Sequence, residues 1–275
     1  PAVNELIQVL IEEVPGSDTG FKVIVNNVSG TASLPTPFAG LAWVVHTADA
    51  PIFTSGMPDA GMGLEDIAED GDPTNLATAL GDDTGLVSPL SPGVWAVHDN
   101  GVTPLFNSGS PDLGEGLEAI AEDGEPGALA TALSSKAGVS SSDLFNTPVG
   151  EAGPGPAVPG GAYEFTFTAQ EGDYLSLATM FVQSNDLFYT FAEGGIALFN
   201  GGTPVSGDVS SQVLLYDAGT EVNEFPGAGL TQVIRQTGAD TGAEENGVVT
   251  NITNVNDGFT YPAVGDIIQV TITSQ

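Results

Sequence analysis

Short apolar runs separated by glycine, proline and polar residues form the main pattern of this chain. These runs are rich in Val, Ile, Thr and aromatic residues, which favour the pleated surface of a sheet. The first twenty residues are harder to read, because VNELIQVLIEEV at 3–14 fits either a helix or a long strand before Pro15-Gly16 ends it. The pattern predicts an all-β fold with strands over 21–25, 163–168, 174–182, 212–216 and 266–273.

A duplicated segment interrupts this pattern between residues 41 and 133. GLEDIAEDGDPTNLATAL, beginning at Gly63, matches GLEAIAEDGEPGALATAL, beginning at Gly116, at 14 of 18 positions. Upstream of the two copies, Trp43 and Trp95 occupy equivalent positions. We predict for each copy a tryptophan-bearing strand and two short helices, with a Gly-Asp-Pro or Gly-Glu-Pro sequence ending the first helix. Two copies are too few for a solenoid, so they predict short helical insertions within one domain.

The domain organisation follows from the breaks in these patterns. Residues 148–161 (PVGEAGPGPAVPGG) predict a long Pro/Gly surface loop. A linker between two domains is the alternative, but the strands on either side are too few for two sandwiches. We therefore expect one domain over 21–275, preceded by an N-terminal segment, 1–20, that can add a strand to a neighbouring subunit's sheet edge.

The composition is strongly acidic, with 36 acidic residues against three basic ones and a formal net charge of −33. Such a surface repels phosphate backbones and anionic lipids, so nucleic-acid and membrane-surface binding are not expected. No run reaches the roughly 20 apolar residues of a membrane helix, so membrane insertion is not expected either. The scarcity of lysine is typical of proteins from extreme halophiles, where the Debye length shrinks to about 3 Å at ~1 M salt.

Some features of the sequence bear on cellular location, although the absence of cysteine assigns no compartment. The chain has no cysteine, which excludes disulfides and thiolate metal sites. The sequence starts at Pro1 with no basic n-region and no long apolar h-region, so it contains no signal peptide, as expected for a processed secreted protein or for a truncated chain. Two glycosylation sequons, at Asn27 and Asn251, are compatible with secretion to the extracellular space or cell surface.

Three carboxylates stand at positions suited to a hard cation. Asp217 and Glu221 flank a tight Ala-Gly turn at the end of a predicted strand, and Asp186 follows another apolar strand. Calcium sites use carboxylate and carbonyl oxygens that converge where the chain turns sharply. Because aspartate also commonly caps turns, the carboxylates alone leave a structural role open.

Three longer blocks carry a resemblance to a known family. FKVIVNNVSG from Phe21, LSLATMFVQSNDLFYTF from Leu175 and YDAGTEVNEFPGAGLTQVIRQ from Tyr216 resemble, in this order, segments of the spondin domain. The resemblance implies a C2-like antiparallel β-sandwich that binds Ca²⁺ through loops at one end. It places Asp186 and Asp217 on two family ligand positions, and Glu221 where the family often has a second aspartate.

The chain departs from the family at Glu221 and at Asn185, which replaces a turn proline. The backbone carbonyls of Leu215 or Tyr216 are expected as further ligands, since calcium takes about 6–8 oxygens. The resemblance implies an extracellular adhesion module that binds an extracellular protein or matrix component. The alternative is a self-assembling homo-oligomer or filament that uses the N-terminal segment as an added strand.

Enzymatic activity is not expected. The sequence has no Gly-x-Ser-x-Gly elbow, no cysteine nucleophile and no nucleotide-binding glycine pattern. The two histidines, His46 and His98, occupy equivalent positions of the duplication and are expected to pack beside the tryptophans. The acidic residues at the predicted helix ends lack the ligand spacing of an EF-hand, so they are expected to be solvated; these are Asp70, Asp72, Asp123 and Glu125.

Overall fold

The computed structural model describes residues 1–13, 21–46, 52–53, 55–56, 58–59, 61–83, 88–224, 226–227, 229–259 and 261–274. The chain forms two compact units. One holds Pro1–Val44 and Ala50–Ala79, and the other holds Val45–Asp49 and Leu80–Gln275. The predicted domain over 21–275 therefore spans parts of both units.

The fold is β-rich and antiparallel, with 25% strand and 17% helix. No helix in the described part of the chain is long and apolar enough to cross a bilayer. The strands are β1 (Ile7–Glu13), β2 (Phe21–Asn27), β3 (Leu90–Asp99), β4 (Val139–Phe145), β5 (Asp173–Phe181), β6 (Leu187–Thr190), β7 (Ile196–Ala197), β8 (Phe199–Asn200), β9 (Thr203–Pro204), β10 (Gly207–Asp208), β11 (Leu214–Asp217), β12 (Thr250–Asn251) and β13 (Thr271–Ile272). The α-helices are α1 (Leu64–Glu69), α2 (Thr74–Asp83), α3 (Leu117–Asp123), α4 (Gly127–Leu133) and α5 (Val264–Ile267), and 3-10 turns cover Val3–Glu5, Ser29–Thr31, Ser210–Gln212 and Ile252–Asn254.

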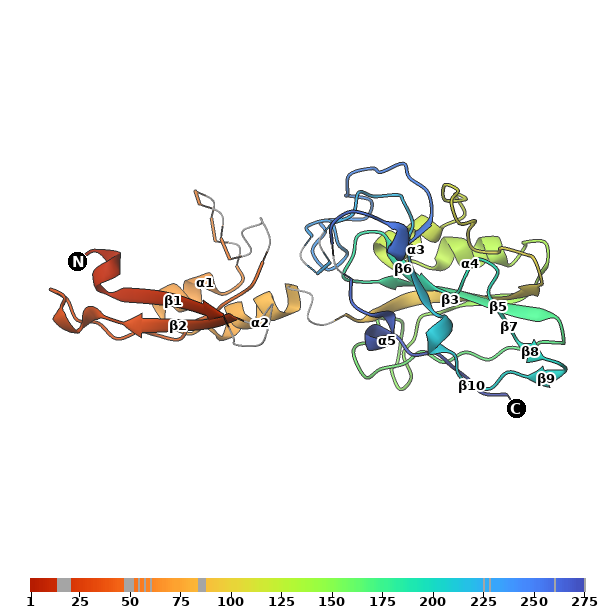
Figure 1. The fold of residues 1–275 in the computed structure, drawn as a ribbon, viewed down its shortest axis with the longest axis horizontal. Helices are drawn as coiled ribbons and strands as arrows, with labels where there is room; N and C mark the ends of the chain where they lie inside the picture. The colour runs from red at the N-terminus through yellow and green to blue at the C-terminus, as the bar shows by residue number, and fades with distance from the viewer. Residues whose placement is uncertain are drawn as a thin grey trace. The chain divides into compact units, whose positions relative to one another are not determined.

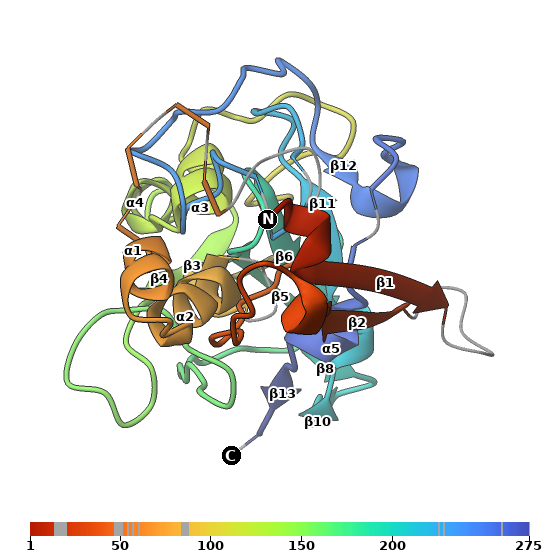
Figure 2. The same cartoon turned by 90° about the vertical axis from the view of Figure 1, so that its left-hand side faces the viewer.

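The N-terminal unit contains a two-stranded sheet and the first copy of the duplication (Figure 2). Residues 3–14, for which the sequence left helix and strand open, contain strand β1. This strand pairs with β2 from Ile7↔Asn27 to Glu13↔Phe21. Helices α1 and α2 confirm the helical part of the first copy. The predicted tryptophan strand of this copy is wrong, because residues 42–46 pair with no strand in the described part of the chain and Trp43 is 80% exposed.

The second unit is built on a seven-stranded antiparallel sheet (Figure 1). The strands follow the order β12-β11-β6-β5-β3-β4, and β7 pairs with β5 beside this path. The predicted strands over 174–182 and 212–216 are confirmed as β5 and β11. Unlike the first copy, the second copy forms its tryptophan strand, which is β3 and lies between β4 and β5. The two copies therefore share helices but differ in the environment of their tryptophans.

The two faces of this sheet carry separate cores because successive side chains of a strand point to opposite sides. On one face, Val94 and Ala96 of β3 pack with buried residues of α3 and α4, including Leu117 and Leu129. On the other face, Trp95 stacks on Phe165 with ring centroids 5.4 Å apart. Two layers thus cover the sheet: helices α3 and α4 lie on one face, and α5 with residues outside regular elements lies on the other.

Two predicted strands are largely wrong. Residues 163–168 form no strand, although their aromatic residues pack inwards as the alternation predicts. In residues 266–273, the first positions belong to α5, and only the two residues of β13 form a strand. The alternating pattern identified the buried side chains here, but backbone pairing depends on partner strands that local sequence does not specify.

The two histidines, like the two tryptophans, differ in burial. His98 is fully buried, and its ring nitrogens bond to the carbonyl of Asp99 at 3.0 Å and to Ser176 Oγ at 2.9 Å. Burial lowers the pKa of His98, which favours the neutral ring. His46 is exposed. His98 is thus buried near the end of β3, but its ring lies near that of Tyr174, with centroids 6.2 Å apart, and packing beside the tryptophans stays a prediction.

Candidate metal centre

Asp186 and Asp217 lie at adjacent ends of two paired strands. Asp186 closes the turn between β5 and β6, and Asp217 is the last residue of β11. Strands β6 and β11 are antiparallel and place Asp217 opposite Leu187, the neighbour of Asp186. The structure thus brings together the two carboxylates that the sequence singled out, because the start of one strand meets the end of the other.

Asp186 is completely buried and only partly satisfied. Its Oδ2 accepts the backbone N–H groups of Thr220 and Glu221, both at 3.1 Å, while its Oδ1 has no hydrogen-bond partner. Burial raises the pKa of Asp186 well above its usual range, and the charge of Asp217 raises it further. A buried carboxylate oxygen without a partner carries a large desolvation penalty. Asp186 Oδ1 is therefore a buried acceptor that a bound cation could satisfy.

Asp217 is held by the turn that follows it. Its Oδ1 accepts the N–H of Gly219 at 2.6 Å, and its Oδ2 accepts the side-chain amide of Asn223 at 2.6 Å. Gly219 has a φ of +70°, and an added Cβ would lie 2.6 Å from the backbone nitrogen of Val248. Only glycine tolerates both the positive φ and the close approach to Val248, so the Ala-Gly sequence of the turn is needed for this geometry.

Glu245 is the third member of the cluster and was not predicted from the sequence. The segment around it runs beside the Asp217 turn: Glu245 N–H donates to the carbonyl of Thr220 at 2.9 Å, and Gly247 N–H donates to Gly219 at 2.7 Å. One ligand oxygen from each of Asp186, Asp217 and Glu245 lies within 4.8 Å of the others. Burial raises the pKa of Glu245, as does the charge of Asp217. Three crowded carboxylates can hold a metal ion here.

Glu221 does not belong to this cluster. Its backbone N–H donates to Asp186. Its carboxylate instead contacts the 240–242 loop, where Oε1 accepts the N–H of Gly242 at 2.6 Å. An added Cβ at Gly242 would lie 2.0 Å from the Glu221 carboxyl carbon, so the loop approaches this closely only with glycine. Burial raises the pKa of Glu221. The glutamate that the sequence suggested for the ion thus faces another set of groups.

The remaining predicted positions lie around the centre. Leu215 and Tyr216 pair with Tyr189 and Phe188 inside the β11–β6 ladder, so their carbonyl groups as calcium ligands stay a prediction. Asn185, which stands where the family has proline, tethers the following loop. Its amide donates to the carbonyl of Val222 at 2.8 Å and accepts the N–H of Glu224 at 3.1 Å.

The two sequon asparagines use their side chains locally. The amide nitrogen of Asn27 donates to the carbonyl of Thr36 at 2.7 Å. Asn251 accepts the N–H of Thr253 at 3.0 Å. Asn27 is exposed and Asn251 is partly buried, and glycosylation of either stays a prediction.

The wider set of known proteins adds no further support for an identity. Neither a scan against protein-family models nor a search of curated proteins gives a match to this chain, so the resemblance to the spondin domain stays a prediction.

Proposed function

We propose that this chain is a calcium-binding protein whose ion is held by Asp186, Asp217 and Glu245. The observation that carries the proposal is the buried Oδ1 of Asp186, which has no partner and has two further carboxylates beside it. A divalent cation would satisfy this oxygen and would offset the burial that raises the pKa values of all three acids, together with the charge of Asp217 that further raises those of Asp186 and Glu245.

Calcium is the cation that this set of ligands favours. All three ligand groups are carboxylates, which are hard oxygen donors, and the chain contains no cysteine for a soft-metal site. Calcium accepts irregular sets of about 6–8 oxygens, including backbone carbonyls. The carbonyl groups of Leu215 and Tyr216 are the proposed additional donors. The ion would fix the Asp217 turn and the Glu245 segment at one end of the sheet.

We further propose that the protein is a secreted binding module of a halophile, with an extracellular protein or matrix component as its partner. The resemblance to spondin domains and the acidic composition support this proposal. The role of calcium would be structural: it would hold the loops that surround Asp217 in one conformation for binding. No catalytic role is assigned to the site.

Calcium is expected to raise the melting temperature of the protein, and Asp217→Asn is expected to abolish this increase. Free calcium at about 100 times its Kd stabilises a folded state by about 2.7 kcal/mol, or roughly 5–10 °C for a domain of this size. Differential scanning calorimetry at high salt, with calcium or with chelator, measures the shift. Glu171→Gln, an exposed acid in the same unit, is the control and should keep the full response. Equal melting temperatures of the wild type with calcium and with chelator would refute the proposal.

A second candidate function is self-assembly through the N-terminal sheet. Val9 and Ile11 of β1 share one face with Val23 of β2, and all three are more than half exposed. A two-stranded sheet with an uncovered apolar face is unstable alone in water and pairs readily with another chain.

Ile11→Asp is therefore expected to convert high-mass species into monomer, because it places a charge in the centre of this apolar face. Light scattering at high salt measures the mass. Gln8→Asp lies on the opposite face of the same strand and should leave assembly intact. A wild-type chain that stays monomeric at all concentrations would exclude this function.

A further inference from the structure

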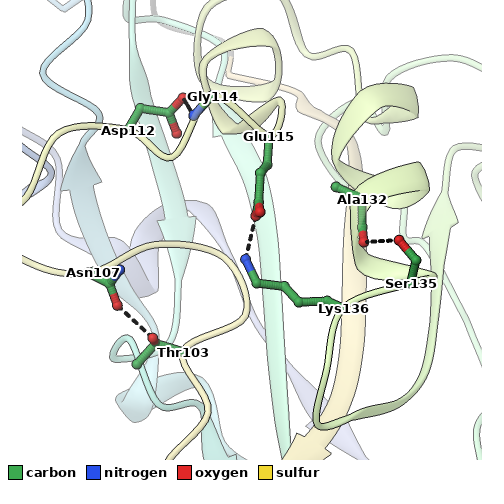
Figure 3. Close-up of polar contacts among 8 residues, drawn as sticks. All are labelled: Thr103, Asn107, Asp112, Gly114, Glu115, Ala132, Ser135 and Lys136. Atoms are coloured by element: carbon green, nitrogen blue, oxygen red, sulfur yellow. Dashed lines mark hydrogen bonds and ion pairs between the residues drawn. The ribbon is translucent and has the colours of Figure 1, made fainter.

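Asn223 lies in the loop that follows the Asp217 turn, and its side chain has one satisfied and one unsatisfied end. Its Nδ2 donates to Asp217 Oδ2 at 2.6 Å, whereas its Oδ1 is buried without a hydrogen-bond partner. Asn107, another partly buried asparagine of the same unit, shows the more common arrangement, because its Oδ1 accepts the hydroxyl of Thr103 at 2.6 Å (Figure 3). A buried amide oxygen without a donor costs free energy. The oxygen of Asn223 therefore needs a partner that the described part of the chain does not supply.

This oxygen borders the carboxylates of the candidate metal centre. The oxygen and nitrogen of a planar amide are about 2.2 Å apart, so Asn223 Oδ1 lies within about 5 Å of Asp217 Oδ2. Asp217 in turn has a ligand oxygen within 4.8 Å of those of Asp186 and Glu245. Asp186 Oδ1 is likewise buried and unpaired. Two buried oxygens that lack donors thus belong to neighbours of the same carboxylate.

Asn185 fixes the backbone on both sides of Asn223. Its side-chain amide donates to the carbonyl of Val222 at 2.8 Å and accepts the N–H of Glu224 at 3.1 Å. Asn185 directly precedes Asp186 and is only 1% exposed, so it ties the Asn223 segment to the turn that carries Asp186. The side chain of Asn223 is therefore held at the centre without an ion, and little conformational entropy is lost when it contacts one.

A half-turn about the last side-chain bond of Asn223 exchanges the two ends of its amide. The oxygen then takes the position from which the nitrogen now reaches Asp217, and the rest of the residue stays in place. Without an ion, the nitrogen end is favoured there, because it donates to a carboxylate. With a divalent cation bound to Asp217, the oxygen end is favoured, because calcium accepts asparagine oxygens together with carboxylates.

We propose that Asn223 is a ligand of the ion held by Asp186, Asp217 and Glu245, and that its amide turns its oxygen to the ion on binding. The inference rests on the proposed function and deepens it, because it identifies a fourth side-chain ligand, which is uncharged. Three carboxylates and one neutral oxygen repel one another less in the metal-free centre than four carboxylates would.

Replacement of Asn223 distinguishes a ligand from a purely structural residue. Isothermal titration of the full chain with calcium chloride measures the affinity in about 1 M NaCl, where a Debye length of about 3 Å suppresses diffuse binding to the acidic surface. Asn223→Leu removes the oxygen at similar volume and should weaken calcium binding by about tenfold or more. Asn223→Asp keeps an oxygen but places a second carboxylate against Asp217. With chelator, this variant should melt below the wild type, whereas its calcium affinity should equal or exceed that of the wild type.

Asn107→Asp is the matched control, because it adds the same charge at a partly buried asparagine to which Thr103 can still donate. It should keep the wild-type calcium affinity. Unchanged affinity in Asn223→Leu would overturn the inference, and so would weaker binding by Asn223→Asp, which decides alone if Asn223→Leu fails to fold. If the wild type binds no calcium, the proposed function fails and the inference fails with it. Wild-type binding that Asn223→Leu leaves unchanged overturns the inference alone.

Discussion

Replacing Trp95 by alanine is expected to lower the free energy of unfolding by about 3–5 kcal/mol, whereas the same change at Trp43 should stay within about 0.5 kcal/mol. The two residues occupy equivalent positions of the duplication, but Trp95 is 6% exposed and Trp43 is 80% exposed. Trp95 also stacks on Phe165 and contacts Phe167, with ring centroids 5.4 and 5.6 Å away. Its removal leaves a cavity, while removal of Trp43 leaves none.

Urea unfolding followed by far-ultraviolet circular dichroism measures this difference. The chain has only two tryptophans, so each variant leaves a single fluorescent reporter. Emission from Trp43→Ala should be blue-shifted, as for a buried indole, and emission from Trp95→Ala should resemble free tryptophan in water. Equal losses of stability in the two variants would contradict the packing described above.

Glu122→Gln is expected to remove a one-proton share of the fall in stability between pH 5 and pH 8 in the metal-free protein. Burial raises the pKa of Glu122 from 4.5 to about 8, and the charges of Glu221, Glu118 and Asp240 add to this shift. The folded state therefore binds a proton that the unfolded state has released. This stabilisation is complete below about pH 4.5 and is lost as the pH rises through about 8, with a slope of at most about 1.4 kcal/mol per pH unit.

Glutamine imitates the protonated acid, so the variant should lack this one-proton slope. Urea midpoints measured with chelator from pH 5 to pH 8 provide the test. Glu125→Gln should follow the wild type, because that acid is exposed. A wild-type slope that survives in Glu122→Gln would show that other groups carry the pH dependence.

The sequence predicted the central strands β5 and β11 better than the segments outside the sheet. Asp186 and Asp217 follow long apolar runs whose antiparallel pairing makes their ends meet, so local pattern sufficed to join them. Glu245 was not predicted because its segment has no apolar alternation, and hydrogen bonds to Gly219 and Thr220 hold it beside the Asp217 turn.

The duplication shows where local sequence stops being informative. Helical spacing and glycine-proline breaks specify the paired helices α1–α2 and α3–α4 in both copies. Burial of the tryptophan instead depends on strands supplied from elsewhere in the chain: Trp95 has β4 and β5 beside it, and Trp43 has no such neighbours in the described part of the chain. Nearly identical sequences thus meet different surroundings.

Glu221 joins two parts of the chain through a single residue. Its amide donates to Asp186, and its carboxylate accepts the N–H of Gly242. A change in the position of the 240–242 loop would therefore move the amide on which Asp186 depends. Coupling of this kind is reciprocal, so a ligand that fixes this loop and an ion at Asp186 would change each other's affinity by the same factor.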